Sequence, residues 1–134
     1  MKGFDFYNWD FFYWYVGLGV LLLTLLGMNI SRLRISNKIA NGDGGNLEIK
    51  KAIRAHGNAI EHVLPYGLAV MVLTHMRYES TLLGILVFGF LSIRLLHAYS
   101  MVSSAFNLRR VSALSTYLFE LAACVLIFNG IYQS

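Results

Sequence analysis

Three kinds of residue are scarce in this chain of 134 residues, and each scarcity excludes a class of protein. Charged side chains make up 13% of the sequence, against roughly a quarter in a soluble domain, while 57% of the residues are hydrophobic. The single cysteine, Cys124, excludes an intrachain disulfide, and its apolar neighbours favour a buried side chain over a reactive thiol. The single proline, Pro65, leaves no proline-rich linker, so we expect one domain over residues 1–134. Together these shortages indicate a small integral membrane protein.

Several motifs of soluble proteins are also missing. The glycine-rich segment 41–46 lacks a following Gly-Lys-Ser/Thr and a preceding strand, so it indicates a flexible turn rather than a phosphate-binding loop. The histidines have no cysteines or carboxylates at metal-ligand spacing, so we expect no metal site. The basic residues cluster in two loops, which suits a membrane topology better than nucleic-acid binding. The N-terminus lacks the features of a cleavable signal, so we expect the first apolar run to remain as a span.

Apolar runs predict an all-α bundle of four membrane-spanning helices. Their lengths are near the ~20 residues that cross the hydrocarbon of a bilayer. The predicted spans are residues 11–30, 52–76, 81–99 and 111–132. Aromatic residues are dense from Phe4 to Tyr15, which indicates that the start of the first span is anchored among lipid headgroups. The turn at residues 75–80 is short, so the second and third spans should be antiparallel neighbours.

Positive charge sets the expected orientation of the spans. The loops at residues 31–51 and 100–110 are rich in lysine and arginine, whereas the turn between the second and third spans holds one arginine and one glutamate. The positive-inside rule therefore places the two basic loops in the cytoplasm and both termini outside.

The second span opens with a line of polar groups. Arg54, Asn58 and Glu61 have i, i+4, i+7 spacing, which places them on one narrow sector of a helix. Pro65 extends this line and frees the backbone carbonyl of Glu61, because proline has no N–H to donate. Snorkelling to the headgroups explains Arg54 alone, but Glu61 lies about 10 Å deeper and needs a cation or hydrogen-bond donors. His56 points to a different face, and we expect it to brace a neighbouring helix.

Ionisable residues of the other spans lie at a similar depth. Arg94 and His97 share one face near the end of the third span, and Arg109 and Arg110 open the fourth. Each of them has a simpler explanation when it is taken alone. Arg94 can extend to the headgroups, His97 can lie at the interface, and the arginine pair can serve the membrane topology. Taken together, and with Arg32 from the first span, they predict an arginine-rich pocket for a small anion with several carboxylates, because guanidinium groups bind carboxylates bidentately. Such cations would also lower the pKa of a bound thiol.

Glu120 lies about 15 Å from Arg110 along the fourth span, near the middle of the bilayer. Two interpretations stay open for it. Either it is protonated or hydrogen-bonded to a neighbouring helix, or it lines a polar cavity or a subunit interface. A small transporter or channel that uses Glu120 is a further hypothesis, but the chain has no internal repeats or paired broken helices to support it.

The pattern Arg-x-His-x-Asn-x-x-Glu-x-x-x-Pro at residues 54–65, between a basic loop and apolar spans, resembles the signature of the MAPEG superfamily (membrane-associated proteins in eicosanoid and glutathione metabolism). The resemblance implies a four-helix protomer and a homotrimer, with glutathione bound between subunits on the cytoplasmic side. It implies that Arg54, Asn58 and Glu61 hold the carboxylates and amine of glutathione, and that Arg32 joins this site. The short loops suit a bacterial-type member, hence a protein of a bacterial inner membrane.

Two further pairs resemble branches of this family. Arg94 and His97 resemble the Arg-x-x-His pair of the prostaglandin E synthase branch, and we expect both at the glutathione site. Arg109 resembles the arginine that opens the fourth span and stabilises the thiolate in the enzymatic branches, with Arg110 as the alternative. The tyrosine of the eicosanoid branches falls on Met101, which departs from their pattern.

The resemblance therefore implies a glutathione transferase, or a glutathione peroxidase, with a role in detoxification. It would react glutathione thiolate with a lipophilic electrophile or hydroperoxide that arrives from the bilayer. The expected partners are glutathione, a lipophilic small molecule and membrane lipid. The alternative is a non-catalytic lipid- or glutathione-binding membrane protein of the same fold, against which the arginines at residues 109–110 argue.

Overall fold

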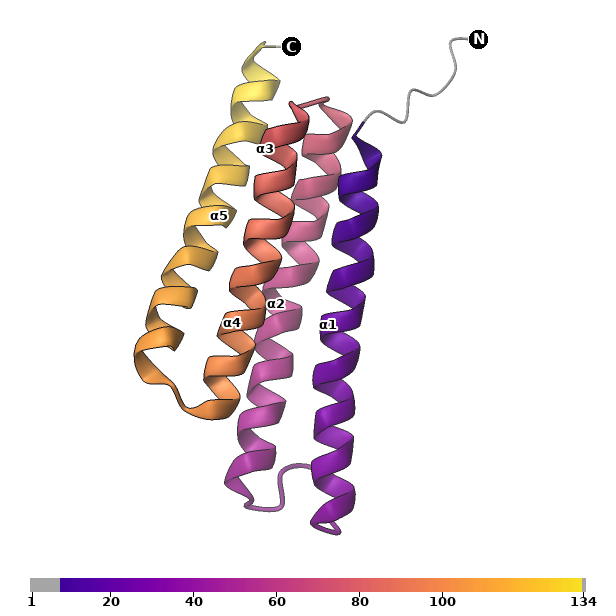
Figure 1. The fold of residues 1–134 in the computed structure, drawn as a ribbon, viewed down its shortest axis with the longest axis vertical. Coiled ribbons are helices and arrows are strands. Elements are labelled where there is room, and N and C mark those ends of the chain that lie inside the picture. Colours follow the sequence, from indigo (N-terminus) through magenta and orange to yellow (C-terminus); the bar gives the residue numbers. More distant parts are fainter. Residues whose placement is uncertain (1–7, 134) are drawn as a thin grey trace.

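The computed structural model describes residues 8–133, and helices make up almost all of them (Figure 1). Four rods are formed by α1 (Trp9–Ser36), α2 (Leu47–His75), the continuous series α3 (Ser80–Gly84), η1 (Ile85–Gly89, a π-helix) and α4 (Phe90–Ser103), and finally α5 (Phe106–Gln133). The expected all-α bundle is therefore confirmed. Phe4, Phe6 and Tyr7 of the predicted aromatic anchor lie outside the described residues.

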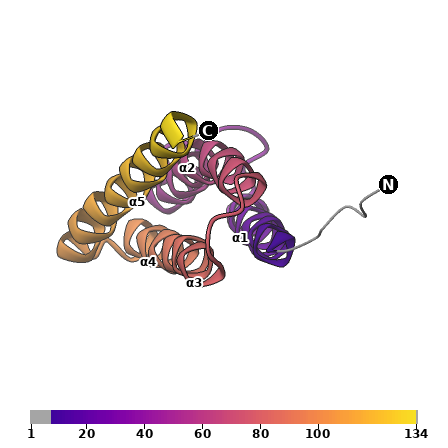
Figure 2. The same ribbon diagram turned by 90° about the horizontal axis from the view of Figure 1, so that it is seen from above.

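Successive rods run in opposite directions along the bundle (Figure 1). The start of α1 and the end of α5 lie at one end, and the α1–α2 and α4–α5 connections lie at the other. Seen along the bundle, α1 and α5 occupy opposite sides, and α2 packs against α1, α4 and α5 (Figure 2). The predicted turn between the second and third spans is confirmed at residues 76–79.

The helices are longer than the predicted spans, so two predicted loops are wrong in extent. The segment 31–51 is helical outside residues 37–46, and the segment 100–110 is helical outside Ser104–Ala105. Hydropathy reports the thickness of the hydrocarbon, whereas a helix continues until a capping residue ends it. The side chain of Asn46 provides such a cap, because it accepts hydrogen bonds from two backbone N–H groups of the first turn of α2.

Three rods in the described part of the chain are long and apolar enough to cross a membrane, namely α1, the α3–η1–α4 rod and α5. Helix α2 is as long as α1, but its polar residues make it less apolar. Buried side chains recur along α2 from Ile49 to Thr74, because three other rods surround it. The least apolar rod therefore has a buried face along most of its length, which shelters polar groups from the hydrocarbon.

An aromatic core joins α1, α2 and α4. The rings of Tyr66 and Phe90 are stacked, with 3.7 Å between their centroids, and Tyr15 packs against both rings. The Tyr15 hydroxyl donates a hydrogen bond to the Val63 carbonyl at 2.7 Å, and the Tyr66 hydroxyl donates one to the Leu86 carbonyl at 3.2 Å. Buried aromatic rings carry large apolar areas, so this core fixes the position of α2 beside its neighbours.

Candidate functional site

A polar cavity of about 150 Å³ lies between α2, α4 and α5. Its walls are formed by Arg54, Asn58 and His62 of α2, Arg94, His97 and Met101 of α4, and Arg109, Ala113, Thr116 and Tyr117 of α5. Arginines from three helices face it, and no carboxylate among the described residues lines it. The cavity therefore presents positive charge and hydrogen-bond donors to any molecule inside it.

Arg94 is the most deeply buried charged residue of the cavity, with 1% of its surface exposed. Its Nη2 donates to the backbone carbonyl of Asn58 at 3.2 Å and to the Asn58 Oδ1 at 2.7 Å, and its Nη1 donates to the Thr116 Oγ1 at 3.2 Å. Its Nε has no hydrogen-bond partner, and no carboxylate forms an ion pair with it, among the described residues. A buried cation held only by neutral groups is costly, so this arrangement is suited to binding an anion.

His97 is buried beside Arg94 and is held by Ser112 of α5. The Nδ1 of His97 lies 2.9 Å from the Ser112 Oγ, and this hydroxyl donates to the Leu108 carbonyl at 2.7 Å. Because the hydroxyl proton is used in that bond, the Ser112 oxygen accepts from His97, and the ring proton lies on Nδ1. The Nε2 of the neutral ring is then an acceptor.

Arg109 and Arg110 point in different directions from α5. Arg109 lines the cavity, whereas the Cζ of Arg110 lies 5.9 Å from the centroid of the exposed Phe106 ring. Successive residues of a helix are about 100° apart around its axis, so only one of the pair can face α2 and α4. Arg109 is therefore the candidate that the structure brings to the cavity.

Two predicted ligands of glutathione, Arg32 and Glu61, lie outside the cavity. Arg32 is exposed on α1, where its Nη2 donates to the Asn29 Oδ1 at 2.9 Å. Glu61 is exposed on α2 and makes no hydrogen bond or ion pair among the described residues. The predicted set is thus divided, with Arg54, Asn58, Arg94, His97 and Arg109 together and Arg32, Glu61 and Arg110 apart.

His56 lies at the contact between α1 and α2. A Cβ atom built on Gly27 of α1 would lie 3.6 Å from the His56 Nε2, and His56 does not line the cavity. This position agrees with the expected bracing of a neighbouring helix.

Three polar residues of the cavity, His62, Thr116 and Tyr117, are not predicted by the sequence motifs. The signal for Thr116 is its i+7 spacing from Arg109, which continues one face of α5. His62 also forms the pair that answers the question about Glu120, since its Nδ1 lies 2.7 Å from the Glu120 Oε1. Of the two interpretations of Glu120, the structure supports hydrogen bonding to a neighbouring helix.

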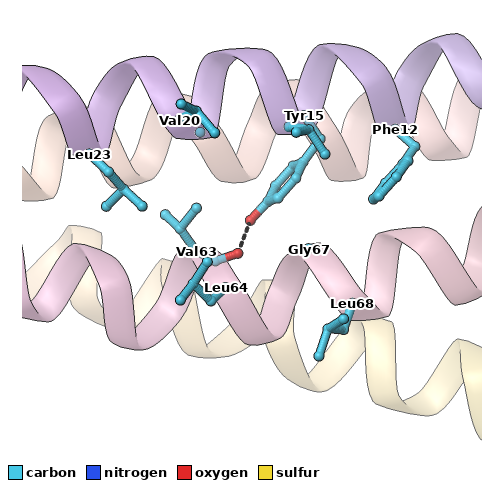
Figure 3. A pocket seen from close by; sticks show the side chains of 10 residues that line it. Phe12, Tyr15, Val20, Leu23, Val63, Leu64, Gly67 and Leu68 are labelled. Carbon is cyan, nitrogen blue, oxygen red and sulfur yellow. Dashed lines mark hydrogen bonds between the residues drawn. The ribbon is translucent and has the colours of Figure 1, made fainter.

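A second hollow, of about 200 Å³ between α1 and α2, differs in kind from the polar cavity. Figure 3 shows that it is lined by aliphatic and aromatic side chains, among them Leu23, Leu64 and Leu68. The hydroxyl of Tyr15 is turned inward to the Val63 carbonyl (Figure 3), so the groove offers apolar contacts to its surroundings. Such a groove suits lipid chains, whereas ionisable side chains gather in the polar cavity.

Comparison with known proteins shows the family of this chain. The model of the MAPEG family matches residues 12–129 of this chain. The chain is 35% identical over 104 residues to "Inner membrane protein YecN" of Escherichia coli strain K12. The aligned segment covers 77% of this chain and 79% of that protein. The YecN protein of Escherichia coli O6:H1 matches to the same extent. With three apolar helices long enough to span a bilayer, the chain is a membrane protein, and it belongs to the MAPEG family.

Proposed function

We propose that this protein is a glutathione-dependent membrane enzyme that activates glutathione as a thiolate beside Arg109. The observation that carries the proposal is the buried Arg94, whose Nε has no partner, and whose cavity has no carboxylate, within residues 8–133. Glutathione carries two carboxylates, an ammonium and a thiol, and guanidinium groups bind carboxylates in a bidentate manner. An anion of this kind would supply the partner that Arg94 lacks.

Each residue of the cavity has a role in this proposal. Arg94 and Arg54 bind a carboxylate of glutathione, and the hydrogen bonds from Arg94 hold the Asn58 side chain in place beside it. Arg109 lies next to the thiol and stabilises the thiolate, because a nearby cation lowers a thiol pKa. Tyr117 brings a phenol into the cavity, whereas Met101, which stands where the eicosanoid branches have tyrosine, brings none.

The size of the cavity supports a site shared between subunits. Its volume of about 150 Å³ is below the roughly 300–1,000 Å³ of typical ligand pockets, so one chain surrounds only part of the tripeptide. Glu61 is exposed on the outer face of α2 in a bundle of apolar helices, and a carboxylate in that position needs a partner. In a homotrimer, the ammonium of glutathione would be that partner, and Arg32 of an adjacent copy would complete the site.

The reaction begins with the bound thiolate. As a transferase, the enzyme forms a bond between sulfur and carbon while the leaving group departs with its electron pair. As a peroxidase, the enzyme directs the thiolate to one oxygen of the hydroperoxide, so that the O–O bond breaks and an alcohol and the sulfenic acid of glutathione form. A second glutathione then reacts with the sulfenic acid to give the disulfide and water. Lowering the thiol pKa and positioning both reactants provide the catalysis. Lipophilic substrates reach the cavity from the bilayer.

The proposed orientation follows from the charges at the two ends of the bundle. The cavity lies towards the end with the α1–α2 and α4–α5 connections, where most lysines and arginines gather. The positive-inside rule assigns this end to the cytoplasm, which contains the glutathione, and the termini to the other side.

The proposal is tested by adding glutathione to the detergent-purified protein and recording thiolate absorbance and turnover of a model electrophile. Arg109→Ala should still bind glutathione but lose thiolate and turnover by about 100-fold, since a charge aimed at the reacting anion is removed. Arg110→Ala is the matched control and should behave as wild type. Wild-type binding without thiolate would favour the non-catalytic alternative. The absence of thiolate and of turnover, with a lipid hydroperoxide as well, would refute the enzyme.

A further inference from the structure

A carboxylate–imidazole pair joins α2 and α5 at the wall of the polar cavity. The Nδ1 of His62 lies 2.7 Å from the Glu120 Oε1, and this is the only ion pair among the described residues. The side chains are 16% and 28% exposed, respectively, and with a neutral imidazole the contact is a hydrogen bond from the His62 Nδ1–H to the carboxylate. Ionisable groups within spanning helices are costly, so such a pair is a candidate for function and not only for packing.

The pair is directed towards the cavity through His62. This residue lines the cavity, whereas Glu120 does not. An ionised carboxylate can only accept, so the bond requires the ring proton on Nδ1 and leaves Nε2 of the neutral ring as a free acceptor. No hydrogen bond to this Nε2 occurs among the described residues. The Tyr117 ring stands edge-on to the imidazole at 5.8 Å and limits its rotation.

We infer that His62 and Glu120 form a proton-accepting pair for the thiol bound in the cavity, which rests on the proposed glutathione binding. The S–H bond of glutathione breaks, its electron pair stays on sulfur, and the proton bonds to the His62 Nε2. The Glu120 carboxylate stabilises the resulting imidazolium. The proton then returns to the leaving group or to the alkoxide of the product. His62 is thus a catalytic residue, and Glu120 is a positioning residue.

The charges around the cavity favour His62 over the other histidine of the site. The cations that face the cavity come from all three helices and are Arg54, Arg94 and Arg109. They favour the thiolate and oppose an imidazolium. Glu120 offsets this repulsion for His62, whereas the side-chain partner of His97, Ser112, is neutral.

The test is to count the protons released to solvent for each thiolate formed when glutathione binds. A pH-indicator dye in weak buffer near neutral pH measures the number of protons released, and thiolate absorbance measures the number of thiolates formed. The wild-type protein should release well below one proton per thiolate, because His62 retains it. His62→Gln should release about one, or should bind glutathione without forming thiolate. Glu120→Gln keeps the imidazole and should lower the thiolate fraction about tenfold, equivalent to one pKa unit of the bound thiol.

His56→Gln is the matched control, since this histidine of α2 lies against α1 and outside the cavity. It should release protons as the wild type does. Equal proton release by wild type and His62→Gln, with thiolate formed in both, would overturn the proposal that His62 and Glu120 accept the proton. The proposed function would still stand. If His62→Gln fails to fold, an unchanged thiolate-against-pH curve in Glu120→Gln overturns the pair instead. Failure of the wild type to bind glutathione would overturn both proposals.

Discussion

The bundle contains two interiors that differ in how completely one chain satisfies them. In the aromatic core, the rings of Tyr66 and Phe90 stack, and the buried Tyr15 and Tyr66 hydroxyls both have acceptors. In the polar cavity, Arg94 is equally buried, but its Nε has no partner among the described residues and its side chain lines an open space.

This difference separates stability from function. A filled apolar core gains free energy from burial and close packing without any further molecule. A buried guanidinium loses its hydration, and hydrogen bonds to neutral groups compensate for this loss only in part. Burial of the charge becomes favourable only with an anion nearby. Substitutions in the aromatic core should therefore change folding, and substitutions in the cavity should change binding.

The largest effect is expected from Phe90→Ala in the aromatic core. Phe90 is fully buried and stacked on Tyr66, so its removal leaves a cavity and should lower the free energy of unfolding by about 4 kcal/mol. Chemical unfolding in mixed micelles measures this loss. The glutathione affinity of the folded fraction, measured by titration calorimetry, should stay within about twofold. If the free energy of glutathione binding fell by more than the free energy of unfolding, the two interiors would not differ in the way described.

Arg94→Met should have the opposite profile. It removes the cation that faces the bound anion, so glutathione affinity should fall roughly 100-fold, or about 2.7 kcal/mol. The free energy of unfolding should hardly change, because an apolar side chain of similar length avoids the desolvation of a buried charge. Titration calorimetry and unfolding in mixed micelles measure the two quantities.

The matched control for Arg94→Met is Arg110→Met, which removes the same charge from an exposed position. Its affinity should change less than about threefold, as expected of a screened surface charge. If Arg94→Met binds normally but unfolds easily, Arg94 belongs to the structural interior and the cavity loses its main argument.

A smaller effect on stability is expected where the π-helix η1 meets α5. A Cβ at Gly89 would lie 2.7 Å from the Cζ of Phe119, so Gly89→Ala should force the ring to shift and cost about 2 kcal/mol. The control is Gly17→Ala on α1, where a Cβ meets nothing within 4 Å and helix propensity should add about 0.5–1 kcal/mol of stability. Thermal unfolding of both variants decides this. Equal stability would show that the contact at η1 is loose.

The smallest effect is expected from Tyr15→Phe. The substitution keeps the ring and removes only the hydrogen bond to the Val63 carbonyl, which within a membrane is worth about 0.6 kcal/mol. A drop of this size in the free energy of unfolding, with unchanged glutathione affinity, would sharpen the comparison. A change in affinity would mean that the core and the cavity are coupled through α2.

The sequence predicts the features that depend on local pattern. Apolar runs predict the four rods because each rod must match the hydrocarbon, and helical periodicity places Arg54 and Asn58 on one face of α2. Periodicity also separates His56 from that face. These properties belong to single helices and do not require knowledge of how the rods pack.

The remaining features depend on the rotation and tilt of the helices relative to one another. The contacts of Arg94 with Asn58 and Thr116 join three helices, and no single stretch of sequence contains them. The choice between Arg109 and Arg110 is a rotation of about 100° about α5, which packing alone decides. The partner of Glu120 is likewise on another helix, so its role could not be predicted from the fourth span alone.

The most direct test is an experimental structure of the protein with glutathione in a lipid environment. We predict a glutathione carboxylate within hydrogen-bond distance of the Arg94 Nε, the sulfur beside Arg109, and Arg32 of an adjacent copy closing the site. Glutathione bound elsewhere, or a cavity that stays empty at saturating glutathione with Arg94 still unpaired, would contradict the proposed function.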